Sequence, residues 1–101
     1  MVYNKLVRDR IPEMIASQGE KPNIRILDAA EYLVHLENKL DEEVKEYHES
    51  KNLEELADIL EVVYALAEAN GHTKDELMAS YSKKHESRGG FTEKIFLISK
   101  E

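Results

Sequence analysis

The chain contains no cysteine and no tryptophan, and it has only two prolines and four glycines among its 101 residues. Without cysteine it can form neither disulfides nor thiolate metal sites. No apolar run resembles a signal peptide or a membrane span, so we expect a cytoplasmic protein with no membrane partner. Positive charge is also scarce, because 14 Lys and Arg face 21 Asp and Glu and leave a net charge of −7. A DNA or RNA surface needs a basic stripe, so this balance argues against nucleic-acid polymers and favours cations as guests.

The few helix start and stop signals divide the chain into four segments. Pro12 suits the first turn of a short helix that ends before Gly19. Asp28, Asn52 and Thr73 are good N-caps, and Gly71 is a good stop. We therefore expect one all-α domain over 1–101, a bundle of three to four helices at about 11–17, 28–49, 52–70 and 73–87. Segments 24–27 and 95–98 read as short strands, and we expect them to pair as a small two-stranded ribbon.

Two acidic pairs lie on either side of the break at 50–52. Glu43 and Glu46 are three residues apart, as are Glu55 and Asp58, so each pair would project from one face of its helix. If the chain reverses at the break, Glu43 comes level with Asp58 and Glu46 with Glu55. Four carboxylates would then face one another at two levels, about 4.5 Å apart along the helix axis.

Such a cluster needs neutralisation, because two like charges about 5 Å apart repel by roughly 3 kcal/mol at an effective dielectric near 20. One interpretation is a solvated acidic face, which is common in a chain with 35% charged residues. The other is a site for Mg²⁺, or Mn²⁺ in its place, with Glu43, Glu46, Glu55 and Asp58 as oxygen ligands. Glu43 favours the second, since it continues the apolar series Leu33, Leu36, Leu40 and Tyr47, where an unpaired charge is costly.

Cations gather near both ends of this acidic chain. Lys5, Arg8 and Arg10 precede the first helix, and Lys83, Lys84 and Arg88 follow one another towards Gly89 and Gly90. One interpretation is ordinary surface charge and a glycine helix stop. The other is a phosphate-binding set, in which the basic side chains neutralise an anion and the glycines let backbone amides approach it. His85 lies in the same stretch, and a single His is more often a surface residue than a ligand or base.

Several of these segments together resemble a known superfamily. They are 4–13 (NKLVRDRIPE), 39–46 (KLDEEVKE), 54–61 (EELADILE) and 88–91 (RGGF). The chain resembles a short, single-domain branch of the all-α nucleoside triphosphate pyrophosphohydrolases, the superfamily of MazG-like and phosphoribosyl-ATP pyrophosphohydrolase-like proteins. Only eight residues separate Glu46 from Glu55, fewer than in many members, so the bundle is either compact or completed by another subunit.

The resemblance implies a Mg²⁺-dependent nucleotide pyrophosphohydrolase that forms a homo-oligomer, a dimer or higher. It would cleave a nucleoside triphosphate, or a related nucleotide, between the α- and β-phosphates to give the monophosphate and pyrophosphate, with house-cleaning as a role. Glu43, Glu46, Glu55 and Asp58 would bind the metal, and Glu43 or Glu46 would serve as general base. The substrate-binding set would be Lys5, Arg8, Arg10, Lys83, Lys84, Arg88, Gly89 and Gly90. The alternative is a non-catalytic, cation-binding helical module for oligomerisation, because apolar residues cover more than one face of the helix at 53–67.

Overall fold

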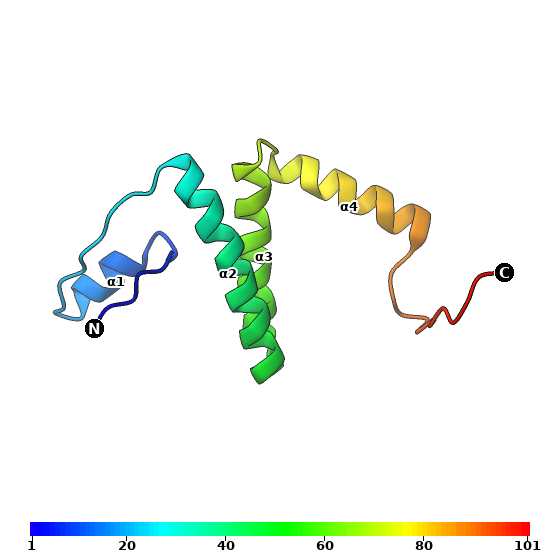
Figure 1. Ribbon diagram of the computed structural model, residues 1–101, viewed down its shortest axis with the longest axis horizontal. Helices are drawn as coiled ribbons and strands as arrows, with labels where there is room; N and C mark the ends of the chain where they lie inside the picture. Colours follow the sequence, from blue (N-terminus) through cyan, green and yellow to red (C-terminus); the bar gives the residue numbers. More distant parts are fainter.

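The computed structural model describes all 101 residues, and it contains four helices and no strand. The helices are α1 (Ile11–Ser17), α2 (Ala29–Ser50), α3 (Leu53–Ala69) and α4 (Lys74–Arg88), as labelled in Figure 1. The all-α class is confirmed, and each helix begins and ends within one residue of the expected bounds. No helix combines the length and the apolar character that crossing a membrane would require.

Local capping explains where the three longer helices begin. Asp28 accepts a hydrogen bond from the Glu31 amide at 2.9 Å, and the Glu31 carboxylate accepts one from the Asp28 amide in return. Thr73 and Glu76 form the same reciprocal pair at the start of α4. Such caps satisfy amides that would otherwise have no partner in the first helical turn. These starts are therefore specified by residues within one turn of each other.

The two longest helices, α2 and α3, form an antiparallel hairpin. α2 ends at Lys51, which adopts the left-handed conformation with φ 59°, and the next residue, Asn52, caps α3 by accepting a hydrogen bond from the Glu55 amide at 3.1 Å. The reversal expected at 50–52 is thus confirmed. Leu36 of α2 and Val62 of α3 are the only buried apolar residues of the chain. The packed interior of a single chain is therefore confined to the seam of this hairpin.

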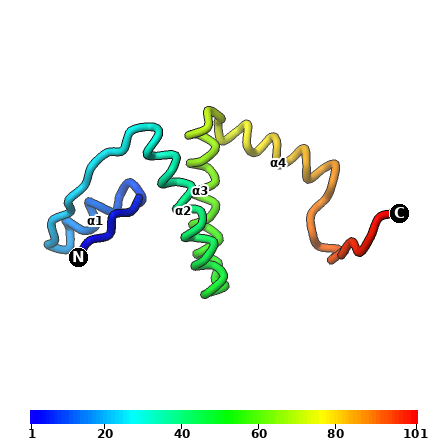
Figure 2. Tube along the Cα trace, viewed as in Figure 1, coloured from blue at the N-terminus to red at the C-terminus, as the bar shows by residue number.

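The other helices stand apart from the hairpin. α4 packs only against α3, and α1 packs against no other helix. α4 diverges from the upper end of α3, so that the two chain termini lie on opposite sides of the hairpin (Figures 1 and 2). The molecule measures 61 × 32 × 23 Å, with a radius of gyration of 17.8 Å. A compact domain of this length has a radius of gyration of about 13 Å, so a single chain is open rather than globular.

The expected ribbon of 24–27 with 95–98 is wrong. The first segment lies in the extended connection between α1 and α2, whereas the second lies in the tail beyond α4. The divergence of α4 carries the tail to the side of the hairpin opposite α1 (Figure 2). A strand requires a neighbour to accept and donate its backbone hydrogen bonds, and neither segment has one.

Candidate metal centre

The hairpin brings the four predicted acidic side chains together near its closed end. We call Glu43, Glu46, Glu55 and Asp58 the carboxylate cluster. Oxygen atoms of Glu43, Glu55 and Asp58 lie within 4.8 Å of one another across the two helices, and those of Glu42, Glu43 and Glu46 do so along α2. The short turn at Lys51 keeps the two helices in the register that this convergence requires.

Glu43 is the most enclosed member of the carboxylate cluster, with only 6% of its surface exposed. One oxygen, Oε1, lies 3.5 Å from the Lys39 ammonium. The other, Oε2, is buried without a hydrogen-bond partner, as is Oε2 of Glu55 on the facing helix. Buried carboxylate oxygens are nearly always paired or bound to a cation, because an unpaired one loses its hydration without compensation.

The pKa values of Glu43 and Glu55 are both raised by their surroundings. Burial raises the pKa of Glu43, and the neighbouring charges of Glu46 and Asp58 raise it further. Loss of hydration also raises the pKa of Glu55, with Glu46 again adding to the effect. In both cases the environment disfavours the ionised form, as expected where like charges converge in a partly buried site.

The N-terminal segment reaches both helices of the carboxylate cluster. The Lys5 ammonium lies 3.1 Å from Glu42 on α2, and the Arg8 guanidinium donates a hydrogen bond to Asp58 on α3 at 2.7 Å. The pKa of Lys5 is raised by this hydrogen bond to Glu42 and by the charge of that carboxylate. Two of the six predicted phosphate-binding cations thus lie at the carboxylates within one chain.

Sequence reasoning missed two residues at this site, Lys39 and Glu42. The Lys39 ammonium bridges Glu42 at 3.2 Å and Glu43 at 3.5 Å, and it is largely buried. Burial opposes ionisation of Glu42, yet the hydrogen bonds from Lys5 and Lys39 prevail and lower its pKa. The spacing of Lys39 to Glu42 and Glu43, three and four residues along one helix, is a signal that would have found the bridge.

The remaining predicted substrate-binding residues lie away from the cluster in a single chain. Arg10 precedes α1 and makes no ion pair with a carboxylate, and the same holds for the three cations of α4: Lys83, Lys84 and Arg88. Gly89 ends α4 with φ 76° and donates its amide to the His85 carbonyl at 2.8 Å. Gly89 therefore acts as a helix stop, and Gly90 follows it into the tail.

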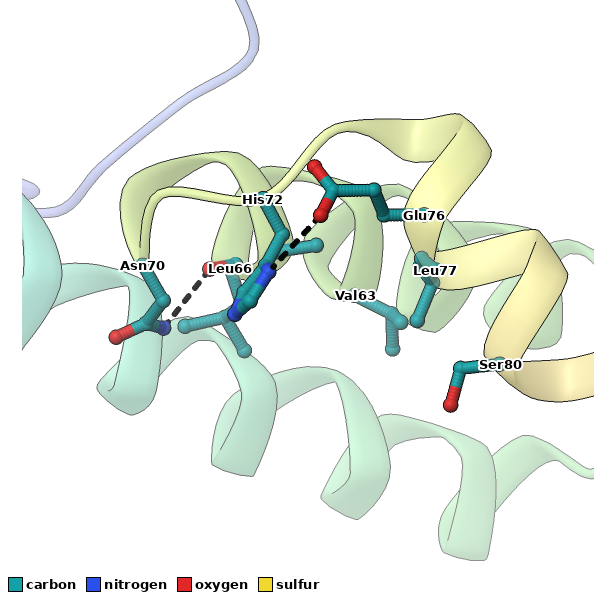
Figure 3. Close-up of a pocket in the computed structure, with 8 residues that line it drawn as sticks. Val63, Leu66, Asn70, His72, Glu76, Leu77 and Ser80 are labelled. Atoms are coloured by element: carbon teal, nitrogen blue, oxygen red, sulfur yellow. Dashed lines mark hydrogen bonds and ion pairs between the residues drawn. The ribbon is translucent and has the colours of Figure 1, made fainter.

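A pocket of about 340 Å³ lies at the other end of the hairpin, between α3 and α4. We call it the α3–α4 pocket. Its lining includes Val63, Leu66, Asn70, Leu77 and Ser80, and His72 Nδ1 lies 3.7 Å from the Glu76 carboxylate at its edge (Figure 3). No predicted site residue contributes to this pocket. Its apolar wall fits a hydrophobic group rather than a phosphate.

The carboxylate cluster has the donor chemistry of a site for a hard divalent cation. Mg²⁺ takes oxygen ligands and uses few protein carboxylates, because it keeps positions for water and phosphate oxygens. The unpaired Oε2 atoms of Glu43 and Glu55 come from facing helices, and Glu46 and Asp58 lie beside them. Glu43, Glu46, Glu55 and Asp58 could therefore hold such an ion.

Comparison with known proteins identifies no family. No protein-family model matches the chain. No solved structure matches it either. An uncharacterized protein of Mycolicibacterium smegmatis (strain ATCC 700084 / mc(2)155) is 57% identical over 42 residues, which make up 42% of this chain and 43% of that protein. The matched region thus spans less than half of this relative.

Proposed function

We propose that this protein is a Mg²⁺-dependent nucleotide pyrophosphohydrolase. It would cleave a nucleoside triphosphate, or a related nucleotide, between the α- and β-phosphates and release pyrophosphate. The observation that carries the proposal is Glu43, a carboxylate 6% exposed whose Oε2 has no partner and which faces further carboxylates from α3. The segments that resemble the all-α nucleoside triphosphate pyrophosphohydrolases contain the same carboxylates.

The positions of the side chains suggest the role of each in the proposed reaction. When bound, Mg²⁺ supplies positive charge to the phosphate oxygens and acidifies a water molecule. Glu43 or Glu46 accepts the proton of the attacking water, because both lie on the same face of α2 within the cluster. Lys5 and Arg8, which already contact Glu42 and Asp58, offset the charge of the substrate phosphates.

The test is a pyrophosphate assay with canonical and altered nucleoside triphosphates in the presence of Mg²⁺. Phosphate should appear only after inorganic pyrophosphatase is added, because cleavage between the α- and β-phosphates releases pyrophosphate. Glu43→Gln should lose turnover by 100-fold or more, about the contribution of a positioned general base or metal ligand. Glu37→Gln, an exposed carboxylate of the same helix, is the matched control and should retain activity.

Thermal unfolding with and without Mg²⁺ separates an inactive protein that binds the metal from one that does not. Mg²⁺ at a hundredfold excess over its Kd should stabilise the wild type by about 2.7 kcal/mol, and Glu43→Gln should lose this gain. No turnover with retained Mg²⁺ stabilisation would support a non-catalytic cation-binding module. A wild-type melt that is indifferent to millimolar Mg²⁺ would refute the metal site.

A further inference from the structure

The N-terminal segment is joined to the hairpin by two ion pairs with acidic residues of the candidate metal centre. We call residues 1–10 the N-terminal strap. Its Lys5 ammonium lies 3.1 Å from Glu42 Oε1, and its Arg8 Nη2 lies 2.7 Å from Asp58 Oδ1. These are the two hydrogen bonds that the strap makes with α2 and α3, and α1 packs against neither helix. The polar attachment of the strap therefore uses carboxylates that a metal ion would also use.

The two ion pairs of the strap are open to water. The side chains of Lys5 and Arg8 are 45% and 54% exposed. Ion pairs of this kind contribute little to stability, because water and salt compete for both partners. Lys39 differs, since its side chain is only 18% exposed and it pairs with Glu42 and Glu43 from within the same helix. Lys5 and Arg8 are thus the exchangeable counter-ions of the site, and Lys39 is the fixed one.

The charges show what could replace the strap. Five carboxylates face three cations at this site: Glu42, Glu43, Glu46, Glu55 and Asp58 against Lys5, Arg8 and Lys39. Lys5 and Arg8 together supply two positive charges, which is the charge of one Mg²⁺ ion. The strap does not satisfy the whole cluster, because Glu43 is 6% exposed and its Oε2 has no partner. A divalent cation can therefore replace the charge of the strap and also reach an oxygen that the strap leaves unpaired.

We propose that Arg8 leaves Asp58 when a divalent cation binds the carboxylate cluster, and that the freed guanidinium then binds the substrate phosphates. A cation on either oxygen of Asp58 would lie at short range from the guanidinium on Oδ1, and the two positive charges would repel. Guanidinium groups bind phosphate oxygens with the same donors that they present to a carboxylate. The strap is thus an internal counter-ion that metal binding converts into a phosphate ligand. This inference rests on the proposed function, whose metal site and phosphate contact it uses.

Two other roles of Arg8 predict different effects on Mg²⁺ affinity. If Arg8 held Asp58 in position for the metal, its removal would weaken Mg²⁺ binding. If the pair were ordinary surface charge, its removal would act only as the loss of any nearby cation does. Lys45 provides that comparison, because it is exposed, lies two residues from Glu43 on α2 and pairs with no carboxylate. Exchange at Asp58 predicts that loss of Arg8 strengthens Mg²⁺ binding more than loss of Lys45 does.

Isothermal titration calorimetry with Mg²⁺ and no nucleotide measures this difference. At 0.15 M salt, charges more than about 8 Å apart are largely screened, so the direct contact dominates. The Kd of Arg8→Ala should fall by about two- to fivefold, the affinity equivalent of one exposed ion pair, and that of Lys45→Ala should stay close to the wild-type value. An unchanged or raised Kd in Arg8→Ala, or an equal fall in Lys45→Ala, would overturn the exchange.

A spin label on the strap tests the displacement directly. The chain has no cysteine, so Tyr3→Cys, at a residue that is 66% exposed, takes a single nitroxide. Saturating Mg²⁺ should make the label more mobile, towards the spectrum that the Tyr3→Cys, Arg8→Ala double variant gives without metal. A spectrum that does not change at Mg²⁺ concentrations that complete the calorimetric titration would overturn the displacement.

Nucleotide kinetics at saturating Mg²⁺ test the second contact of Arg8. Arg8→Ala should raise KM by about tenfold, opposite in direction to its effect on Mg²⁺ binding, because a phosphate ligand is lost. An unchanged KM would overturn the transfer of Arg8 to the phosphates. Absence of turnover in the wild type would refute the proposed function, and the calorimetry and the spin label would still decide the exchange at Asp58. Absence of Mg²⁺ binding in the wild type and in every variant would refute the metal site on which both depend.

Discussion

Glu43 carries a carboxylate at a position where the packing of two helices favours an apolar side chain. Its pKa is raised by burial and then by Glu46, and the Lys39 ammonium at 3.5 Å offsets its charge in part. We therefore expect Glu43→Gln to hold or gain stability when no divalent cation is present. The gain is at most about 3 kcal/mol, the repulsion of two charges about 5 Å apart at an effective dielectric of 20.

Urea unfolding in the presence of EDTA measures this change, with Glu37→Gln as the control on the exposed side of α2. A loss of stability in Glu43→Gln would show that the Lys39 pair, rather than a cation, balances this carboxylate in the folded protein.

Glu31 shows the opposite electrostatic situation, in which the folded state favours the charged form. Hydrogen bonds from the Arg25 side chain and the Asp28 amide lower the pKa of Glu31 to about 2, from 4.5. A lowered folded-state pKa contributes stability above pH 4.5, and this contribution is lost as the pH falls towards 2. Glu31→Gln should therefore melt below the wild type at pH 7, and the difference should shrink between pH 4.5 and pH 2. Melts at pH 7, 5 and 3 check this. A difference that persists unchanged at pH 3 would assign the effect to packing instead.

At the scale of helices, the predictable features are those specified by residues within a turn or two. The caps at Asp28, Asn52 and Thr73 all form, so the starts of α2, α3 and α4 follow from the sequence. The two acidic pairs converge because the turn between α2 and α3 is short. Local rules of this kind act within one turn and are insensitive to the rest of the chain.

Features that depend on distant parts of the chain were not predictable. The direction of α4 depends on its limited packing against α3, and no local signal sets it. The expected ribbon would require α4 to return the tail towards the segment before α2, and the structure places the tail on the other side of the hairpin. The α3–α4 pocket depends on the same direction. The ion pairs of Lys39 with Glu42 and Glu43 are a different case. Their spacing of three and four residues along one helix already indicated these contacts.

α4 packs only against α3, so the Thr73 cap at its start is important for the stability of the helix. α4 has 15 residues, none of them buried, and helices of this length are marginal in water on their own. Thr73→Ala removes the side chain that accepts from the Glu76 amide and should cost about 1 kcal/mol. Hydrogen exchange should then accelerate in the first turns of α4 while the amides of α2 and α3 keep their rates. Thr92→Ala, in the exposed tail, is the control. Equal acceleration in all helices would show that α4 unfolds only with the whole molecule.

The open shape of the whole molecule leads us to expect that its stability depends on protein concentration. The radius of gyration is 17.8 Å, against about 13 Å for a compact domain, and Leu53, Leu56 and Leu60 lie exposed on one face of α3. The homo-oligomer that the resemblance implies would cover this apolar face. For a dimer that unfolds to two chains, each tenfold dilution lowers the free energy of unfolding by about 1.4 kcal/mol. With roughly 200 residues in the cooperative unit, Tm should fall by about 3 to 6 °C per tenfold dilution.

A substitution within this apolar face of α3 gives the sharpest form of this prediction. Leu60→Lys places a charge within the exposed apolar face of α3 formed by Leu53, Leu56 and Leu60, so a dimer that buries this face should dissociate. Sedimentation should then show an 11.7 kDa species, and Tm should no longer depend on concentration. Glu61→Lys lies next to it in sequence but about 100° around α3, so it should remain dimeric. If Leu60→Lys sediments as a wild-type dimer does, the assembly uses another surface, because a buried ammonium group without a partner would not be tolerated.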